Sequence, residues 1–290
     1  MEVSPCMPGA MDGDCDFRGG GDNSGVLRRI HVARVLVGEI ILDEREAHHV
    51  RDVLRLREQT AVEVFDDAGN VGAGVLGILV SGRVTVRVES ISARDETGLK
   101  LVSAAAVPKG ARADWMVEKL SELGVDVFVP LATERSVSLP EGKNKPARWQ
   151  RLAEEAAKQS HRRGVMRIDA LTDLPDAITA ASEEGTAWCL STGGGTIPLV
   201  EKMGAMGRGT ITLFIGPEGG WTAEETEMFE RSGILGVSLT STILRIETAA
   251  IAAAAVVAMR GGYWPIRLKK KAGTPHPNPP PGVPGGGERK

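Results

Sequence analysis

The sequence predicts an α/β protein in which a small β-rich domain precedes a larger domain built on a parallel sheet. Three observations lead to this prediction. Short β-branched segments separated by Gly, Asp and Asn turns occupy residues 28–88. After residue 100, apolar strand-like segments alternate with helix-like ones, as in sheets buried on both faces. Both chain ends are rich in Gly, Pro or charged residues and lack apolar periodicity. We therefore expect a disordered extension over residues 1–26, a β-domain over 27–95, an α/β domain over 96–268 and a disordered tail over 269–290.

The elements of the first domain follow from its β-branched runs. One helix is expected near residues 44–56, and a turn at residues 66–70. The expected strands are RRIHVARV, VGEIIL, AVEVF, GILV and VTVRV. Short strands at this spacing with one interposed helix are typical of a small β-barrel.

The second domain is predicted to alternate strand and helix to its end. The expected strands are LVSAAAV, VDVFVPL, MRIDAL, TAWCL, ITLFI and GVSL, and the expected helices span 112–123, 147–160, 174–182, 223–232 and 248–260. Thr222 and Glu225 stand at the spacing of a capping box, and Gly233 follows as a stop signal. Gly124 is expected to end the first of these helices in the same way.

Composition excludes several classes of protein. The formal net charge is −3 and aromatic residues are 4%, so the chain lacks the overall basicity and the stacking groups of general single-strand binders. Three cysteines without metal-type spacing predict neither a disulfide framework nor a metal site. The longest apolar run, Ala249–Met259, is far shorter than the ~20 residues of a membrane span. These features predict a cytoplasmic protein without a membrane or metal partner.

A glycine-rich turn follows the strand over residues 211–215 and opens directly into the helix at 223. Ligands in α/β sheets bind beyond the carboxyl ends of the strands, so this turn is a candidate binding loop. It lacks the Lys-Ser/Thr of a phosphate loop and the order of a dinucleotide fingerprint, and Glu218 would repel a pyrophosphate. A nicotinamide-dependent enzyme is therefore disfavoured. A carboxylate suits a ligand with hydroxyls and a cationic centre, although a purely structural turn is the alternative.

The stretch over residues 239–248 forms a second irregular turn, which leads into an apolar helix. Arg245 and Glu247 lie close to that buried junction and need partners. They could form a structural ion pair with each other, or Arg245 could act as a catalytic cation.

These two stretches carry a family resemblance together with a third. GPEGG before a capped helix, followed by ILR-x-ETA, resembles the signature of the SPOUT methyltransferases. The third segment comprises Pro108–Gly110, Asp114–Lys119, Glu122–Val125, Pro130–Leu131 and Glu134–Val137. With Arg28–Val32 it is similar in order and spacing to the RsmE family, which methylates N3 of a uridine in 16S ribosomal RNA. The resemblance covers residues 28–268, whereas Thr240 and Thr242 stand where the family usually has Gly and Arg.

The resemblance implies a PUA-like barrel, a SPOUT domain with a deep trefoil knot, and a homodimer that binds S-adenosylmethionine inside the knot. Its cradle would comprise Leu190 with the 191–195 loop, Ile215–Gly219 and Leu239–Leu244. The expected contact residues are Leu190, Ser191, Gly193, Ile215, Gly216, Glu218, Gly219, Leu239, Thr240, Ile243 and Leu244. Arg245 would stabilise the uracil anion, and Glu247 is a candidate base, with water as the alternative.

The implied partner is 16S ribosomal RNA in the small ribosomal subunit. The basic residues expected to contact it are Arg28, Arg29, His31, Arg51, Arg55 and Arg135, against the alternative of a solvated surface. Two other functions stay open: a SPOUT enzyme acting on another RNA, such as the ribose of transfer RNA, and a noncatalytic RNA-binding assembly factor.

Overall fold

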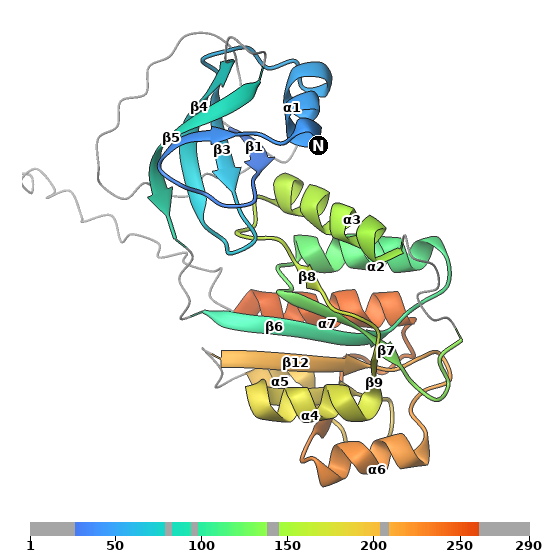
Figure 1. The fold of residues 1–290 in the computed structure, drawn as a ribbon. Coiled ribbons are helices and arrows are strands. Elements are labelled where there is room, and N and C mark those ends of the chain that lie inside the picture. Colours follow the sequence, from blue (N-terminus) through green and yellow to red (C-terminus); the bar gives the residue numbers. More distant parts are fainter. Residues whose placement is uncertain (1–26, 79–82, 94–97, 138–144, 204–208, 261–290) are drawn as a thin grey trace, which may run out of the picture.

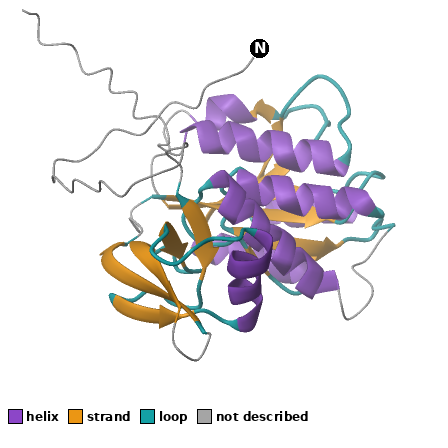
Figure 2. Cartoon of the chain, turned by 90° about the horizontal axis from the view of Figure 1, so that it is seen from above, coloured by secondary structure: helices purple, strands orange, loops and turns teal. Residues whose placement is uncertain are grey.

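The computed structural model describes residues 27–78, 83–93, 98–137, 145–203 and 209–260, drawn in colour in Figure 1. The two predicted terminal segments lie outside these residues. The described chain forms two sheets, a smaller one followed by a larger one with helices on both faces (Figures 1 and 2). The prediction of an α/β protein is therefore confirmed.

The smaller sheet has five strands in the order β1-β3-β4-β5-β2. They span Arg28–His31 (β1), Gly38–Ile41 (β2), Ala61–Phe65 (β3), Val71–Ile78 (β4) and Val84–Ser92 (β5). β1 pairs with β3 in parallel and the other pairs are antiparallel. Helix α1 (Glu44–His48) continues into a single π-helical turn, η1 (His49–Val53), where one helix was expected. Alternate β-branched residues such as Val62, Val64 and Val86 are fully buried and form the core of this part.

The larger sheet has the order β11-β13-β10-β12-β6-β7-β8, and β9 also pairs with β7. Its pairs are all parallel, as the apolar runs predicted. The strands span Leu99–Ala106 (β6), Val127–Ala132 (β7), Arg167–Ile168 (β8), Thr172–Asp173 (β9), Gly185–Leu190 (β10), Ile197–Pro198 (β11), Gly209–Ile215 (β12) and Leu235–Ser238 (β13). The expected strand MRIDAL, residues 166–171, contains only the two-residue β8, and β9 begins just after it. The two-residue β11 was not foreseen, because a strand that short leaves no pattern.

Helices cover both faces of the larger sheet (Figure 1). They span Ala111–Glu122 (α2), Lys145–Ser160 (α3), Leu174–Glu184 (α4), Leu199–Lys202 (α5), Ala223–Arg231 (α6) and Ile246–Arg260 (α7). Met116 and Leu120 of α2 and Ala250 of α7 pack in the core on one face. Ile178 of α4 and Phe229 of α6 pack in a separate core on the other face. Of these helices, only the short α5 was not predicted.

The helix ends agree with their sequence signals. Thr222 and Glu225 form the predicted capping box at the start of α6, with both reciprocal hydrogen bonds present. Gly124 and Gly233 adopt positive φ angles of 86° and 69° just after α2 and α6. Glycine is favoured there because this backbone conformation strains residues with a Cβ.

Helix α3 joins the two sheets through polar contacts. The guanidinium of Arg29, on β1, donates to the carbonyls of Ala157 (3.0 Å) and Arg162 (2.8 Å). Lys158 pairs with Glu46 of α1 at 2.6 Å, and both side chains are more than nine-tenths buried. Because buried charges are stable only when paired, these contacts fix the smaller sheet on α3.

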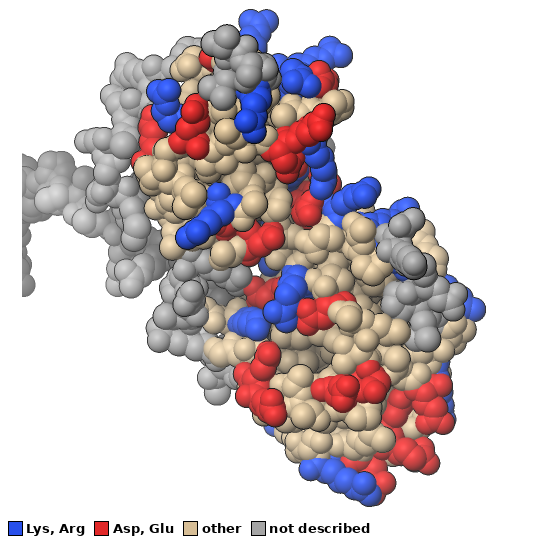
Figure 3. All heavy atoms as spheres, viewed as in Figure 1, with Lys and Arg blue, Asp and Glu red and all other residues tan. Residues whose placement is uncertain are grey.

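Within the residues described, no helix is long and apolar enough to cross a membrane. The described part of the chain also holds no cluster of His, Cys, Asp or Glu suited to a metal ion. On the face shown in Figure 3, Lys and Arg side chains are interspersed with Asp and Glu. Positive charge on this face is therefore limited to small areas, consistent with the formal net charge of −3.

Candidate functional site

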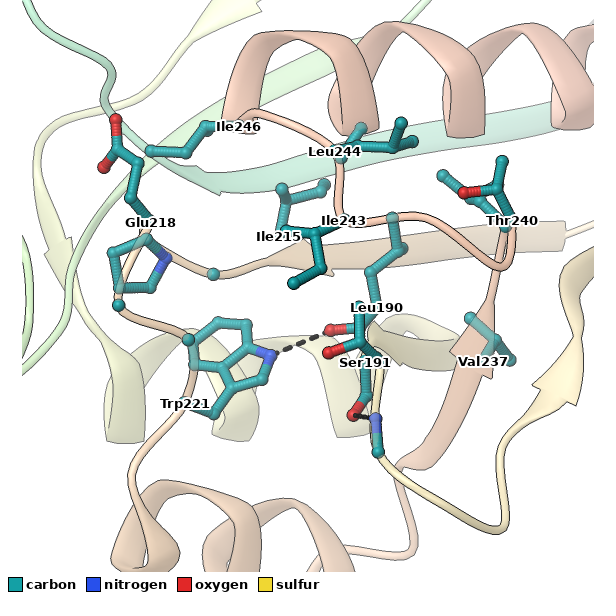
Figure 4. Close-up of a pocket in the computed structure, with 18 of the residues that line it drawn as sticks. Leu190, Ser191, Ile215, Glu218, Trp221, Val237, Thr240, Ile243, Leu244 and Ile246 are labelled. Carbon is teal, nitrogen blue, oxygen red and sulfur yellow. Dashed lines mark hydrogen bonds between the residues drawn. The ribbon is translucent and has the colours of Figure 1, made fainter.

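A pocket of about 450 Å³ opens where three adjacent parallel strands end (Figure 4). Strands β13, β10 and β12 are neighbours in the sheet, so the segments that follow them leave the same edge. These segments converge on the pocket, together with the first turn of α7. The lining residues are Leu190, Ser191, Thr192, Gly193, Ile215, Gly216, Pro217, Glu218, Gly219, Gly220, Trp221, Thr226, Val237, Leu239, Thr240, Thr242, Ile243, Leu244, Ile246 and Ala249. The position is the usual ligand site of an α/β sheet.

The structure brings together the whole set expected to contact a cofactor. All of Leu190, Ser191, Gly193, Ile215, Gly216, Glu218, Gly219, Leu239, Thr240, Ile243 and Leu244 line the pocket. Sequence reasoning did not include Gly220, Trp221, Thr226, Val237, Ile246 or Ala249, which also line it. Trp221 had a signal that could have been used, because it lies between the glycine-rich turn and the capping box.

Trp221 pins the glycine-rich turn to the neighbouring strand. Its indole Nε1 donates to the carbonyl of Leu190 at 3.0 Å (Figure 4). Its ring packs edge-on against Phe229, with the centroids 4.9 Å apart. A Cβ added at Gly216 would lie only 3.0 Å from the indole, so the turn and the ring approach as closely as glycine permits. The pocket wall is thus fixed by one aromatic side chain.

A second contact holds this turn from the segment after β7. Arg135 Nη1 donates to the carbonyl of Gly219 at 2.8 Å and lies 3.5 Å from that of Trp221. The backbone amide of Glu134 donates to Glu225 Oε1 at 2.9 Å, and Glu225 is buried in the capping box. The segment over residues 133–137 therefore braces the turn from outside the pocket.

The walls of the pocket are apolar with one carboxylate. Leucine, isoleucine and valine side chains form one side, and Glu218 is the only charged residue among the described lining residues. None of these described lining residues is basic, and the capping box already uses the amides of Thr222 and Glu225 at the start of α6. A polyphosphate would find neither a cation nor a free helix end there. A ligand with an apolar ring, hydroxyls and a positive charge fits these walls.

Thr240 and Thr242, the two departures from the family pattern, form a small turn of their own. The hydroxyl of Thr240 donates to the carbonyl of Thr242 at 2.9 Å and accepts from the amide of Thr242 at 3.3 Å. Both residues line the pocket. Hydroxyl-to-backbone bonds of this kind order a turn that glycine would leave more flexible.

Arg245 and Glu247 lie beside the pocket but in different surroundings. Arg245 is exposed between two lining residues, and its side chain makes no hydrogen bond or ion pair with the described residues. Glu247 is 4% exposed, and its Oε1 lies 3.6 Å from Arg112 Nη1 on α2. No partner for Glu247 Oε2 occurs among the described residues. The structure therefore does not show the ion pair between Arg245 and Glu247 that one alternative suggested.

The residues expected to contact RNA do not form one group. Arg28, Arg51 and Arg55 are exposed on the smaller sheet or its helical turn. Arg29 is 6% exposed, lies 4.2 Å from the centre of the Phe65 ring and bonds to carbonyls of the larger part, so it is a structural residue rather than a surface cation. Its burial argues against a direct contact with RNA, and it is possible because carbonyls and an aromatic ring receive the guanidinium.

His31 faces a carboxylate across the surface of the smaller sheet. Its Nε2 lies 2.8 Å from Asp67 Oδ1. Burial alone would lower the pKa of this imidazole, but the hydrogen bond and charge of Asp67, with smaller contributions from Glu154 and Glu46, raise it above the ordinary value. The ring is thus tied to an acidic neighbour, which reduces its value as a phosphate contact.

The chain is similar to known proteins in sequence and in fold. The RNA methyltransferase domain model matches residues 95–258. Ribosomal RNA small subunit methyltransferase E of Synechocystis is 31% identical over 226 residues, covering 77% of this chain and 74% of that protein. The protein of the same name from Bacillus subtilis is 28% identical, covering 73% of this chain and 86% of its own. The crystal structure of the Neisseria gonorrhoeae enzyme of this name, bound to S-adenosyl methionine, superposes with a TM-score of 0.71 at 27% identity and covers 81% of this chain and 98% of that one.

Proposed function

The chain belongs to the RsmE family of RNA methyltransferases, and from this premise we propose that it transfers a methyl group from S-adenosylmethionine to N3 of a uridine in 16S ribosomal RNA of the small subunit. The observation that carries the proposal is the pocket, whose position and lining suit that cofactor. The apolar side suits an adenine ring, Glu218 and the threonine hydroxyls suit ribose and the cationic centre, and the volume lies in the range of small-molecule sites.

The residues around the pocket have distinct parts in the reaction. S-adenosylmethionine supplies an electrophilic methyl group when bound. The glycine-rich turn and the Thr240 turn hold the ligand with backbone groups, and Trp221 keeps the wall closed. The guanidinium of Arg245, which has no partner among the described residues, stabilises the negative charge that develops on the uracil as its N3 proton leaves. Glu247 does not line the pocket and pairs with Arg112, which favours water as the proton acceptor.

The finer features of the family complete the proposal. The smaller sheet acts as a PUA-like barrel that binds RNA through exposed arginines, among them Arg28, Arg51 and Arg55. The segments around the pocket form a trefoil knot, and the enzyme works as a cytoplasmic homodimer. The apolar helix α7 supports a dimer, because Met259 is 78% exposed and Ile243, just before the helix, is 85% exposed.

The test is a methylation assay on ribosomal subunits. Purified protein and labelled S-adenosylmethionine are incubated with small subunits that lack the modification, and the RNA is digested to nucleosides for mass spectrometry. We expect label in 3-methyluridine. In a parallel incubation with unmodified transfer RNA, label in a ribose-methylated nucleoside would favour the other SPOUT activity. Cofactor-independent subunit binding without label would favour an assembly factor.

Arg245→Ala tests the assigned role of the exposed guanidinium. Loss of a group that stabilises developing charge costs ~10²–10³-fold in turnover. We expect a loss of that size with unchanged cofactor affinity, because the Arg245 side chain does not line the pocket. Arg245→Lys keeps the charge and should lose less. Near-normal turnover of the alanine variant would remove Arg245 from the mechanism.

A further inference from the structure

Arg135 occupies a position that the proposed activity does not explain. It lies at the tip of a turn after β7, and this turn is closed by the amide of Ser136 donating to the carbonyl of Thr133 at 3.0 Å. The Ser136 hydroxyl also accepts from the amide of Thr133 at 3.0 Å. These bonds order the backbone that carries Arg135.

Only part of the Arg135 guanidinium is used. Nη1 donates to the carbonyls of Gly219 and Trp221, whereas Nε and Nη2 make no hydrogen bond to the described residues. The stem packs on the turn, since a Cβ added at Gly219 would lie 3.1 Å from Arg135 Cδ. The side chain is nonetheless exposed. One edge of the group therefore holds the pocket wall, and the other edge faces away from it into solvent.

The positive charge of Arg135 is not neutralised by a direct ion pair. No carboxylate among the described residues lies within 4 Å of the guanidinium. The charge of Arg135 helps to lower the pKa of Glu224. The backbone amide of Glu224 and the Thr222 hydroxyl lower that pKa more than Arg135 does. An arginine with free donors and uncompensated charge is the group that binds phosphate best.

We propose that Arg135 is a positioning residue that couples RNA binding to the cofactor loop, with its free edge on a phosphate of the RNA and Nη1 on the Gly219 carbonyl. The inference rests on the proposed function and adds a route of communication between the two ligands. A phosphate at the free edge fixes the guanidinium, which orders the turn that lines the cofactor site. Cofactor and RNA then bind cooperatively, and the coupling is equal in both directions.

The experiment measures affinity for small ribosomal subunits with and without saturating S-adenosylhomocysteine, which permits no turnover, at one fixed salt concentration. For the wild-type chain we expect subunit binding at least about fivefold tighter with the nucleoside present. Arg135→Ala should bring this ratio close to one. Arg135→Lys retains the charge but not the two-edged geometry, so it should keep more subunit affinity than the alanine variant and still lose the ratio.

Arg231→Ala is the matched control. Arg231 lies in the last turn of α6, is 72% exposed in its side chain and pairs only with Glu227 among the described residues, so its loss removes one surface charge without touching the pocket. Melting temperatures and nucleoside affinity without subunits show that each variant is folded. A wild-type ratio that both Arg135 variants preserve would overturn the coupling. Failure of the wild-type chain to bind the nucleoside or subunits would instead refute the proposed function.

Discussion

Trp221→Phe should lower the affinity for the cofactor, although Trp221 has no part in the methyl transfer itself. The substitution keeps an aromatic ring against Phe229 but removes the indole N–H that donates to the carbonyl of Leu190 at 3.0 Å. One such hydrogen bond contributes ~1 kcal/mol, and the part-buried carbonyl left without its donor costs more. We therefore expect unfolding to become easier by about 1–2 kcal/mol. Since 1.4 kcal/mol is a tenfold change in affinity, cofactor binding should weaken by about five- to thirtyfold if the whole of this free energy is lost from the bound state.

Isothermal calorimetry with S-adenosylhomocysteine measures the affinity, and chemical denaturation measures the free energy of unfolding. Trp115→Phe is the control, because Trp115 is 47% exposed on α2, does not line the pocket and has no indole hydrogen bond to the described residues. The control should bind normally. If Trp221→Phe lost stability but its affinity for S-adenosylhomocysteine stayed within about twofold of the wild-type value, the pocket would not depend on this hydrogen bond, and the reasoning would fail.

Three further predictions concern stability. Thr222→Ala removes the hydroxyl of the α6 capping box and should lower the free energy of unfolding by ~1 kcal/mol in denaturant titration, whereas no loss would mean that the cap contributes nothing. Lys158→Met leaves Glu46 buried without its partner and should cost about 3–5 kcal/mol, and the double variant with Glu46→Gln should recover part of it. Burial lowers the pKa of His31, but the hydrogen bond and charge of Asp67 raise it above the ordinary value of 6.5. The folded state therefore binds this proton more tightly than the unfolded chain does. The stability that this adds is fully present below pH 6.5 and is lost as pH rises through the higher pKa of the folded state. His31→Gln should flatten that decline in denaturation midpoints measured between pH 5 and 8.

Much of the fold could be predicted because the strand signals are local. Runs such as ITLFI and AVEVF are apolar and β-branched, and each became a strand at nearly the predicted residues. The loops that line the pocket could also be located, because parallel strands leave one edge of the sheet and the irregular turns follow them. That β13, β10 and β12 would be neighbours depends on strand order, which no local pattern contains.

The partners of the charged and aromatic side chains could not be predicted. Trp221 bonds to a carbonyl 31 residues away, Arg135 to one 84 residues away, and Arg29 to carbonyls 128 and 133 residues away. Each pairing depends on which surfaces of two distant segments meet. Arg29 was expected to contact RNA, and its side chain is instead buried and bonds to carbonyls near the end of α3. Glu247 pairs with Arg112 rather than with the suspected Arg245.

The composition of the pocket explains why side chains from other segments help to hold its loops. Its described lining includes four glycines, and a glycine has no side chain with which to hold its own loop. Side chains hold two of these segments: Trp221, itself a lining residue, and Arg135 hold the turn after β12, and the ion pair between Glu247 and Arg112 holds the start of α7. A site that binds its ligand through backbone groups depends on such side chains to keep its loops rigid. Substitutions in these supporting residues should therefore change affinity as substitutions in the lining do, and a scan limited to lining residues would miss Arg135, Arg112 and Glu247.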